Sequence, residues 1–252
     1  MMHRPVRTLA LTALAALLPL AASAAERTWA NTYSLDQDGS FALENINGDV
    51  VIEAWDRDEV DVQATITSKS QEAVDEVEIE VDASGDSVDI STDYPERKGR
   101  NGRYEAASVA YHVRMPRLAR AEIELVNGDL RLDGVAGAVD AELVNGDLTA
   151  SGLAGNADLT TVNGEIHATF DQLGSDQRVD IESVNGSVDL YLPSSADAVL
   201  EAETVHGDIE SDFELTRDED RYVGQEAHGR IGAGGGQIDL ENVNGTIRIH
   251  RQ

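Results

Sequence analysis

The stretch AEIELVNGDLRLDGVAG at residues 121–137 is followed at residues 138–155 by AVDAELVNGDLTASGLAG, which repeats it with few changes. The same Asn-Gly dipeptide, replaced once by His-Gly, recurs along most of the chain. A period near 20 residues is the signature of a repeat architecture. The anchors of the repeat are Asn47-Gly48, Asn127-Gly128, Asn145-Gly146, Asn163-Gly164, Asn185-Gly186, His206-Gly207 and Asn244-Gly245.

Apolar residues alternate with polar ones on both sides of each anchor, as they do in β-strands. Ile123 and Leu125 precede the second anchor, and Leu130 and Leu132 follow it. Two short strands therefore flank each Asn-Gly, and the sequence predicts an all-β fold.

Two arrangements of these strands are open. Asn-Gly between two strands is the strongest short signal for a tight hairpin, but it can also turn the corner of a coil in a parallel solenoid. The residue before each Asn is always apolar and β-branched, whereas the residue before that is mostly polar, from Asn45 to Asn242. We interpret this as a coil corner that buries the β-branched residue and leaves its predecessor at the bend. The β-branched residues are Ile46, Val126, Val144, Val162, Val184, Val205 and Val243.

The pattern thus favours a parallel β-solenoid, similar to a single-stranded β-helix, with coils of 18–22 residues. Gly, and less readily Asn, accepts the positive φ that such corners need. The 38-residue gap before Asn244 has room for one further coil, around residues 229–236. We expect Arg248, His250 and Arg251 to close the C-terminal end, where charges discourage edge pairing.

Residues 25–120 are less regular and are predicted to cap the other end, whereas residues 121–252 form the regular coils of the same single domain. The predicted elements are a coil at 41–52, a strand at 59–67, a helical turn at 70–76, a hairpin at 77–92, a basic loop at 94–103 and a strand at 109–115.

Residues 1–24 have the pattern of a secretory signal peptide. Arg4 and Arg7 form a basic start, an apolar run covers residues 9–22, and Ala22-Ser23-Ala24 offers small residues for cleavage. We expect an exported protein, either periplasmic or at the cell surface, with no transmembrane segment. The chain has no Cys, which excludes disulfides, thiol catalysis and thiolate metal sites.

The formal charge of the chain is −29. Without residues 1–24 it has 17 basic and 48 acidic residues, a formal −31. A field of that sign repels nucleic acid and anionic lipid, and it attracts cations or basic partners. Binding of nucleic acid is therefore excluded.

The chain resembles the DUF4097 family of adhesin-like bacterial proteins and, more loosely, the head GIN domain. The resemblance rests on LENINGDVVIEAWDRDEVDV at 43–62, VAYHVRMPRLARAEIELVNGDL at 109–130 and the later VNG coils. It covers nearly the whole chain after residue 24. It implies a β-solenoid protein of the cell envelope and supplies no catalytic residues.

Acidic residues recur at two positions before the anchors, and each position is acidic in six of the seven repeats. Equivalent positions of stacked coils lie about 4.8 Å apart, so like charges there repel by about 1 kcal/mol before salt screening. The alternatives are a solvated face that prevents aggregation, a docking surface for a basic partner, and a calcium-binding surface. The candidate face comprises Glu44, Glu124, Glu142, Glu182, Glu203 and Glu241, three residues before the anchor, and Glu122, Asp140, Asp158, Asp180, Glu201 and Asp239, five before it.

Catalytic chemistry has little support. A glycosidase or polysaccharide lyase needs a few carboxylates at fixed positions in a cleft, whereas these recur in every coil. The His residues show no metal-ligand spacing, and His206 is interpreted as a turn variant. The sequence therefore predicts a non-catalytic exported scaffold or adhesin-like binding module, without catalytic, cofactor or metal residues, that contacts a basic envelope protein or cationic peptide. A calcium-stabilised structural protein and a polysaccharide-acting β-helix enzyme are the alternatives.

Overall fold

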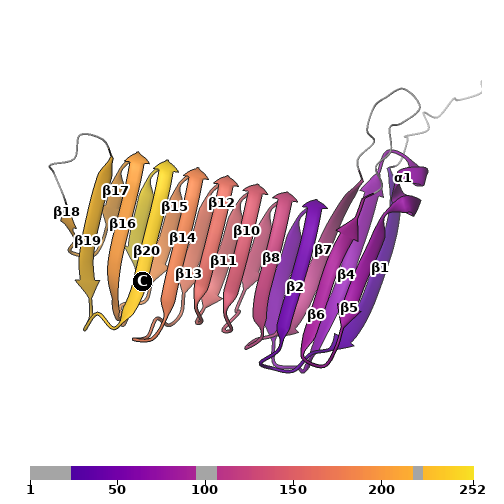
Figure 1. The fold of residues 1–252 in the computed structure, drawn as a ribbon, viewed down its shortest axis with the longest axis horizontal. Coiled ribbons are helices and arrows are strands. Elements are labelled where there is room, and N and C mark those ends of the chain that lie inside the picture. The colour runs from indigo at the N-terminus through magenta and orange to yellow at the C-terminus, as the bar shows by residue number, and fades with distance from the viewer. Residues whose placement is uncertain (1–23, 95–106, 218–223) are drawn as a thin grey trace, which may run out of the picture.

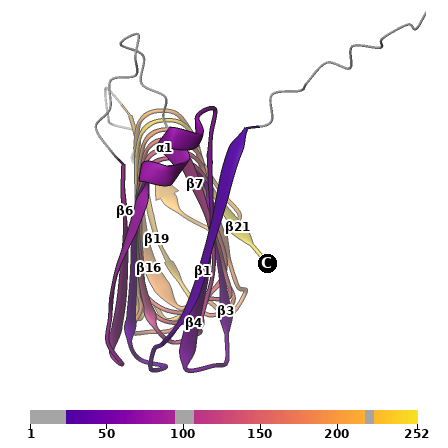
Figure 2. The same cartoon turned by 90° about the vertical axis from the view of Figure 1, so that its right-hand side faces the viewer.

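The computed structural model describes residues 24–94, 107–217 and 224–252. Within these ranges the chain forms two long sheets, of ten and eleven strands, whose strands run across the long axis of the molecule (Figure 1). Seen along that axis, the two sheets form two facing layers (Figure 2). Nearly all of the predicted signal peptide and most of the predicted basic loop at 94–103 lie outside the described residues.

Both sheets combine strands from distant parts of the chain. In spatial order, the ten-stranded sheet runs β1 (Ala25–Ser34), β4 (Glu59–Ser68), β7 (Ser108–Pro116), β3 (Val50–Trp55), β9 (Leu130–Asp133), β11 (Leu148–Leu153), β13 (Ile166–Phe170), β15 (Val188–Leu192), β21 (Ile247–Arg251), β17 (Ile209–Ser211). The eleven-stranded sheet runs β18 (Thr216–Arg217), β19 (Gln225–Ile231), β16 (Ala198–His206), β20 (Gly236–Asn244), β14 (Arg178–Asn185), β12 (Ala157–Asn163), β10 (Val139–Asn145), β8 (Arg120–Asn127), β2 (Ser40–Asn47), β6 (Ser87–Asp93), β5 (Glu78–Ala83).

Each repeat contributes one strand to each sheet. The strand before Asn-Gly joins the eleven-stranded sheet, and the strand after it joins the ten-stranded sheet. Neighbouring repeats pair in parallel and in register, so that Asn145 lies between Asn127 and Asn163. The prediction of an all-β fold with stacked parallel strands is confirmed. The hairpin alternative is wrong, because the two strands at each anchor lie in different sheets.

The repeats do not stack in sequence order at the C-terminal end. β20 lies between β14 and β16, and β21 lies between β15 and β17. After β15 the chain therefore leaves the next strand position in each sheet empty and forms β16 and β17 one position further out. It then returns, and β20 and β21 occupy the positions left between. The expectation that Arg248, His250 and Arg251 close the end is wrong, since β21 is an interior strand.

Antiparallel strands cover both ends of the stack. At the N-terminal end β1, β4 and β7 pair antiparallel, and β5 and β6 form the predicted hairpin. The predicted helical turn is α1 (Gln71–Glu76), and among the described residues no helix has the length and apolarity to cross a membrane. At the other end β19 pairs antiparallel with β16, where a further coil was expected. Antiparallel strands thus cover both sheets at the N-terminal end but only the eleven-stranded sheet at the other, where β17 pairs in parallel with β21.

The side-chain directions next to the anchors are the reverse of those predicted. Residues two before the anchor are buried, with Leu125 and Asn242 only 2% and 3% exposed, whereas the β-branched residues before the anchor are 36–44% exposed. Strand alternation continues up to the turn, so the β-branched residue points outward. Some of the buried polar side chains bond turn carbonyls: Thr204 Oγ1 donates to Gly245 O at 3.2 Å, and Asn242 Nδ2 donates to Gly186 O at 2.7 Å.

Glycine is needed at the anchors because consecutive turns lie in close contact. Gly146 has a φ of +155°, and a Cβ placed there would lie 1.9 Å from the carbonyl oxygen of Gly128. The expected positive φ is confirmed at Gly48, Gly128, Gly146, Gly164, Gly186 and Gly245, but not at Gly207 of the His-Gly anchor. Among the described residues no Asn has a positive φ. The expectation that Asn occurs at the anchors because it accepts a positive φ is therefore wrong.

We expect Gly146→Ala to lower the free energy of unfolding by about 2–5 kcal/mol, since it adds both backbone strain and a clash with the neighbouring turn. Gly85→Ala is the matched control, because a Cβ at Gly85 meets no atom within 4 Å. Urea denaturation followed by circular dichroism measures both. Equal stability of the two variants would contradict the close turn contact.

Candidate functional site

A ladder of Asn side chains fixes the spacing of the repeats. The Nδ2 of each anchor Asn donates to the Oδ1 of the preceding anchor Asn, as from Asn145 to Asn127 at 3.0 Å and from Asn163 to Asn145 at 2.9 Å. The ladder runs through Asn47, Asn127, Asn145, Asn163, Asn185 and Asn244. Asn at the anchor therefore supplies both the donor and the acceptor of the side-chain bonds between repeats.

The acidic residues that follow the turn form a second ladder. The backbone N–H of Asp129 donates to Asp49 Oδ1 at 3.0 Å, and that of Asp147 donates to Asp129 Oδ1 at 2.9 Å. Glu165 N–H continues the series to Asp147 at 2.8 Å. These carboxylates hold the turns together.

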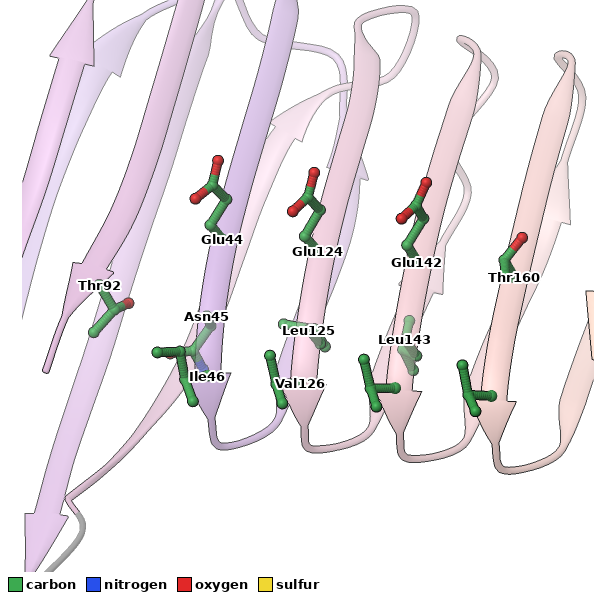
Figure 3. A pocket seen from close by; sticks show the side chains of 12 residues that line it. Glu44, Asn45, Ile46, Thr92, Glu124, Leu125, Val126, Glu142, Leu143 and Thr160 are labelled. Atoms are coloured by element: carbon green, nitrogen blue, oxygen red, sulfur yellow. The ribbon is translucent and has the colours of Figure 1, made fainter. Parts of the chain in front are cut away.

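The Glu residues three before the anchor form one column, the Glu column, on the outer surface of the eleven-stranded sheet. Glu44, Glu124 and Glu142 project from consecutive strands to the same side (Figure 3). In spatial order the column is Glu44, Glu124, Glu142, Thr160, Glu182, Glu241 and Glu203.

Five carboxylates of the Glu column have no basic side chain paired with them in the part of the chain that the structure describes. Among the described residues, the carboxylates at 44, 124, 142, 182 and 241 form no salt bridge. Burial, and then the charges of Glu44 and Glu142, raise the pKa of Glu124. Burial, and then the charge of Glu241, raise the pKa of Glu182.

The acidic residues five before the anchor form a second acidic column, which is partly neutralised. Arg120 lies 3.1 Å from Asp140, and Arg178 bridges Asp180 at 2.6 Å and Asp239 at 3.2 Å. Burial, and then Asp140 and Asp180, raise the pKa of Asp158. The column contains Glu122, Asp140, Asp158, Asp180, Asp239 and Glu201.

The structure thus brings all twelve predicted residues onto one surface, which we name the acidic face. The spatial order differs from the sequence order only where Asp239 and Glu241 precede Glu201 and Glu203. A third column, which we name the β-branched column, lies between the Glu column and the turns. It consists of Ile46, Val126, Val144, Val162, Val184, Val243 and Val205.

The β-branched column was predicted to be buried and so was missed as a surface feature. The uniform β-branched residue before each Asn was the signal that could have indicated it. A shallow hollow of about 300 Å³ lies along it, lined by residues that include Glu124, Val126, Glu142 and Val144. A second, of about 160 Å³, continues it past Val184 and Val243. The candidate site is therefore an apolar column beside an acidic one.

On the opposite sheet, His167 and His250 lie on either side of Tyr191, with ring centroids 4.7 and 4.4 Å from it. Sequence spacing does not bring these His together, because only the position of β21 places His250 beside β15. Within the described ranges, no group of three or more His, Asp or Glu residues is arranged to hold a metal ion.

The comparisons with known proteins agree with this architecture. The Toastrack DUF4097 family matches residues 36–250. The chain belongs to this family. The crystal structure of a "putative cell adhesion protein" from Clostridium sporogenes ATCC 15579 aligns with 90% of this Toastrack chain and 100% of its own, at 14% identity and a TM-score of 0.51.

A "putative adhesin" from Bacteroides fragilis NCTC 9343 aligns with 88% of this chain and 97% of its own, at 15% identity and a TM-score of 0.39. No curated protein matches the sequence. At 14% identity, the likeness to the Clostridium structure is one of fold, and the Toastrack assignment rests on the family match.

We expect the melting temperature of this Toastrack protein to rise as the pH falls from 7 to about 5. Because the pKa values of Glu124, Asp158 and Glu182 are raised on folding, the folded state binds more protons than the unfolded chain in that window. Stability therefore increases on protonation. Glu124→Gln removes a charge between Glu44 and Glu142, which should raise the melting temperature at pH 7 by roughly 2–4 °C and flatten the pH dependence.

Asp61→Asn is the control of opposite sign. A hydrogen bond from Gln63, with a further contribution from Arg114, lowers the pKa of Asp61, so its ionised form stabilises the fold and its loss should lower the melting temperature at pH 7. Calorimetric scans from pH 4 to 8 compare the three proteins. A melting temperature that falls steadily from pH 7 to 5 in the wild type and Glu124→Gln alike would contradict the assignment.

Proposed function

We propose that this protein is an exported, non-catalytic module of the bacterial cell envelope that binds a basic protein or cationic peptide through its acidic face. In this proposal residues 1–24 direct export, and residues 25–252 act as one adhesin-like β-solenoid domain in the periplasm or at the cell surface. Membership of the Toastrack family and the adhesin descriptions of its structural relatives support a binding role over an enzymatic one.

The observation that carries the proposal is the set of four carboxylates of the Glu column that have no internal counter-charge in the described part of the chain, at 124, 142, 182 and 241. The neighbouring acidic column has Arg120 and Arg178 as internal counter-charges, whereas the carboxylates at 124, 142, 182 and 241 have none among the described residues. Like charges at fixed spacing raise the free energy of the unbound face. A partner that brings Lys or Arg side chains to this column relieves that repulsion.

A hydrolytic role fits the same carboxylates less well. Glycoside hydrolysis uses two carboxyl groups at a set separation, of which one is kept protonated by its surroundings. Here Glu124 and Glu182 owe their raised pKa values to burial and to equivalent Glu residues of the next strands. The carboxylates therefore form a repeated surface and not an acid and base pair.

The proposal is tested by cross-linking of the tagged protein in living cells. The test protein, the Glu variant, carries Glu124→Gln, Glu142→Gln, Glu182→Gln and Glu241→Gln. The matched control carries four neutral substitutions at exposed loop carboxylates outside the two acidic columns, Asp38→Asn, Asp86→Asn, Asp171→Asn and Asp176→Asn. Both variants change the net charge equally, so only the place of the charge differs.

We expect a discrete cross-linked partner with the wild type and the control variant, reduced at least tenfold in the Glu variant. Equal cross-linking of all three proteins would overturn the proposal. The calcium alternative predicts another result: the Glu variant would lose a calcium-dependent rise in melting temperature that the wild type shows, without any loss of a partner.

A further inference from the structure

We infer that the β-branched column is the apolar half of the binding surface, and that its occupant is a basic amphipathic helix of the partner. In this arrangement the apolar side of the helix rests on the β-branched column and its Lys or Arg side chains lie over the Glu column. The inference rests on the proposed function and adds the kind of segment that is bound.

Exposed apolar side chains are concentrated at this place. Nine large hydrophobic residues are exposed among those that the structure describes, and seven of them belong to the β-branched column. The other two are Leu118 and Val199. Isolated exposed apolar residues are ordinary, but a contiguous row of them marks an interaction site.

Beside the turn, several strands bury a polar side chain and expose an apolar one, which is the reverse of the usual pattern. Thr161 is buried while Val162 is 37% exposed, and Asn242 is buried while Val243 is 39% exposed. The same inversion occurs at Asn45 and Ile46, where Asn45 is 3% exposed. β-Propensity alone does not require this, because Thr is also β-branched and would suit an exposed strand position without presenting apolar surface.

The two columns lie side by side and face the same way. Residues two apart on a strand project from the same face, about 6.6 Å apart, so Glu124 and Val126 form adjacent points of one surface. Figure 3 shows these side chains, and the hollows beside them are lined by members of both columns. A ligand that fills the hollow contacts apolar groups on one side and carboxylates on the other.

The negative charge of the Glu column determines which kind of ligand can bind there. A second copy of this chain would bring two Glu columns together, and an anionic lipid surface would be repelled, because both add like charge to an unneutralised row. A basic segment with an apolar side fits both columns.

The length of the column fits a helix. Seven strands at about 4.8 Å span about 29 Å, which is the length of a helix of about 19 residues. A helix can lie along the face across the strands, with apolar residues at i, i+3, i+4 and i+7. An extended strand would instead need a free sheet edge, and the edge strands of the eleven-stranded sheet, β5 and β18, lie beyond the two ends of the column.

The inference is tested with a fluorescent 20-residue peptide of Leu, Ala and Lys in that helical pattern, and with a scrambled peptide of the same composition. The Val variant carries Val126→Thr, Val144→Thr, Val184→Thr and Val243→Thr, which keep β-branching and volume. Its control carries Leu118→Thr and Val199→Thr, the exposed apolar residues outside the column. The Glu variant is the third protein.

We expect the helical peptide to bind the wild type and the control with similar affinity, and to bind the Val variant at least tenfold more weakly. Because the protein is almost entirely β, bound peptide should add a helical circular dichroism signal near 222 nm. The scrambled peptide should bind weakly and with the same affinity to the wild type and the Val variant.

If the Val variant binds both peptides as the wild type does while the Glu variant does not, the acidic face binds by charge alone; the inference is then wrong and the proposed function stands. If the Glu variant also binds as the wild type does, the proposed function fails as well. Circular dichroism of each free variant confirms that a loss of binding is not a loss of fold.

Discussion

The contact between successive Asn-Gly turns is the constraint on which the rest of the structure depends. Each turn glycine lies so close to the next that a Cβ on Gly164 would be 1.9 Å from the carbonyl oxygen of Gly146. The Asn side chains then bond from turn to turn. Together these contacts fix both the spacing and the register of the strands, so every position in the repeat becomes a straight column on the surface or in the core.

The same constraint explains why the C-terminal repeats are out of sequence order. The repeat at Asn244 has the amide that the ladder needs, and Asn244 donates to Asn185 at 3.0 Å. The repeat at His206 lacks the amide and stands one place further out, against the antiparallel β19. We infer that the ladder places the Asn-containing repeat inside and leaves the His-containing one at its end.

Much of the fold and of the acidic face could be predicted from the repeat. The Asn-Gly spacing indicated the stacked strands, and the position of Glu124 relative to Asn127 placed it in one column with Glu44 and Glu142. The direction of Val126 could not be predicted in the same way. Thr161 is buried where a turn carbonyl of the neighbouring repeat accepts its hydrogen bond, and that carbonyl is supplied by the stack and not by the local sequence. The place of β21 was missed for a similar reason, since it depends on a contact 59 residues away in the chain.

A stack of fixed spacing cannot relieve repulsion along an acidic column by moving its strands apart. The remaining means are protonation, an internal counter-charge, a neutral residue or a partner. The chain uses an internal counter-charge for Asp140 and Asp180, which are paired with Arg120 and Arg178. It uses a neutral residue at Thr160, which lies between Glu142 and Glu182. The other members of the Glu column lie beside an exposed row of Val, where no arginine of the described chain is paired with the carboxylates at 124, 142, 182 and 241. The protein thus neutralises one acidic column in part and, within the described residues, leaves four carboxylates of the adjacent column without an internal counter-charge next to apolar surface. These are the two features that the proposed basic amphipathic ligand needs.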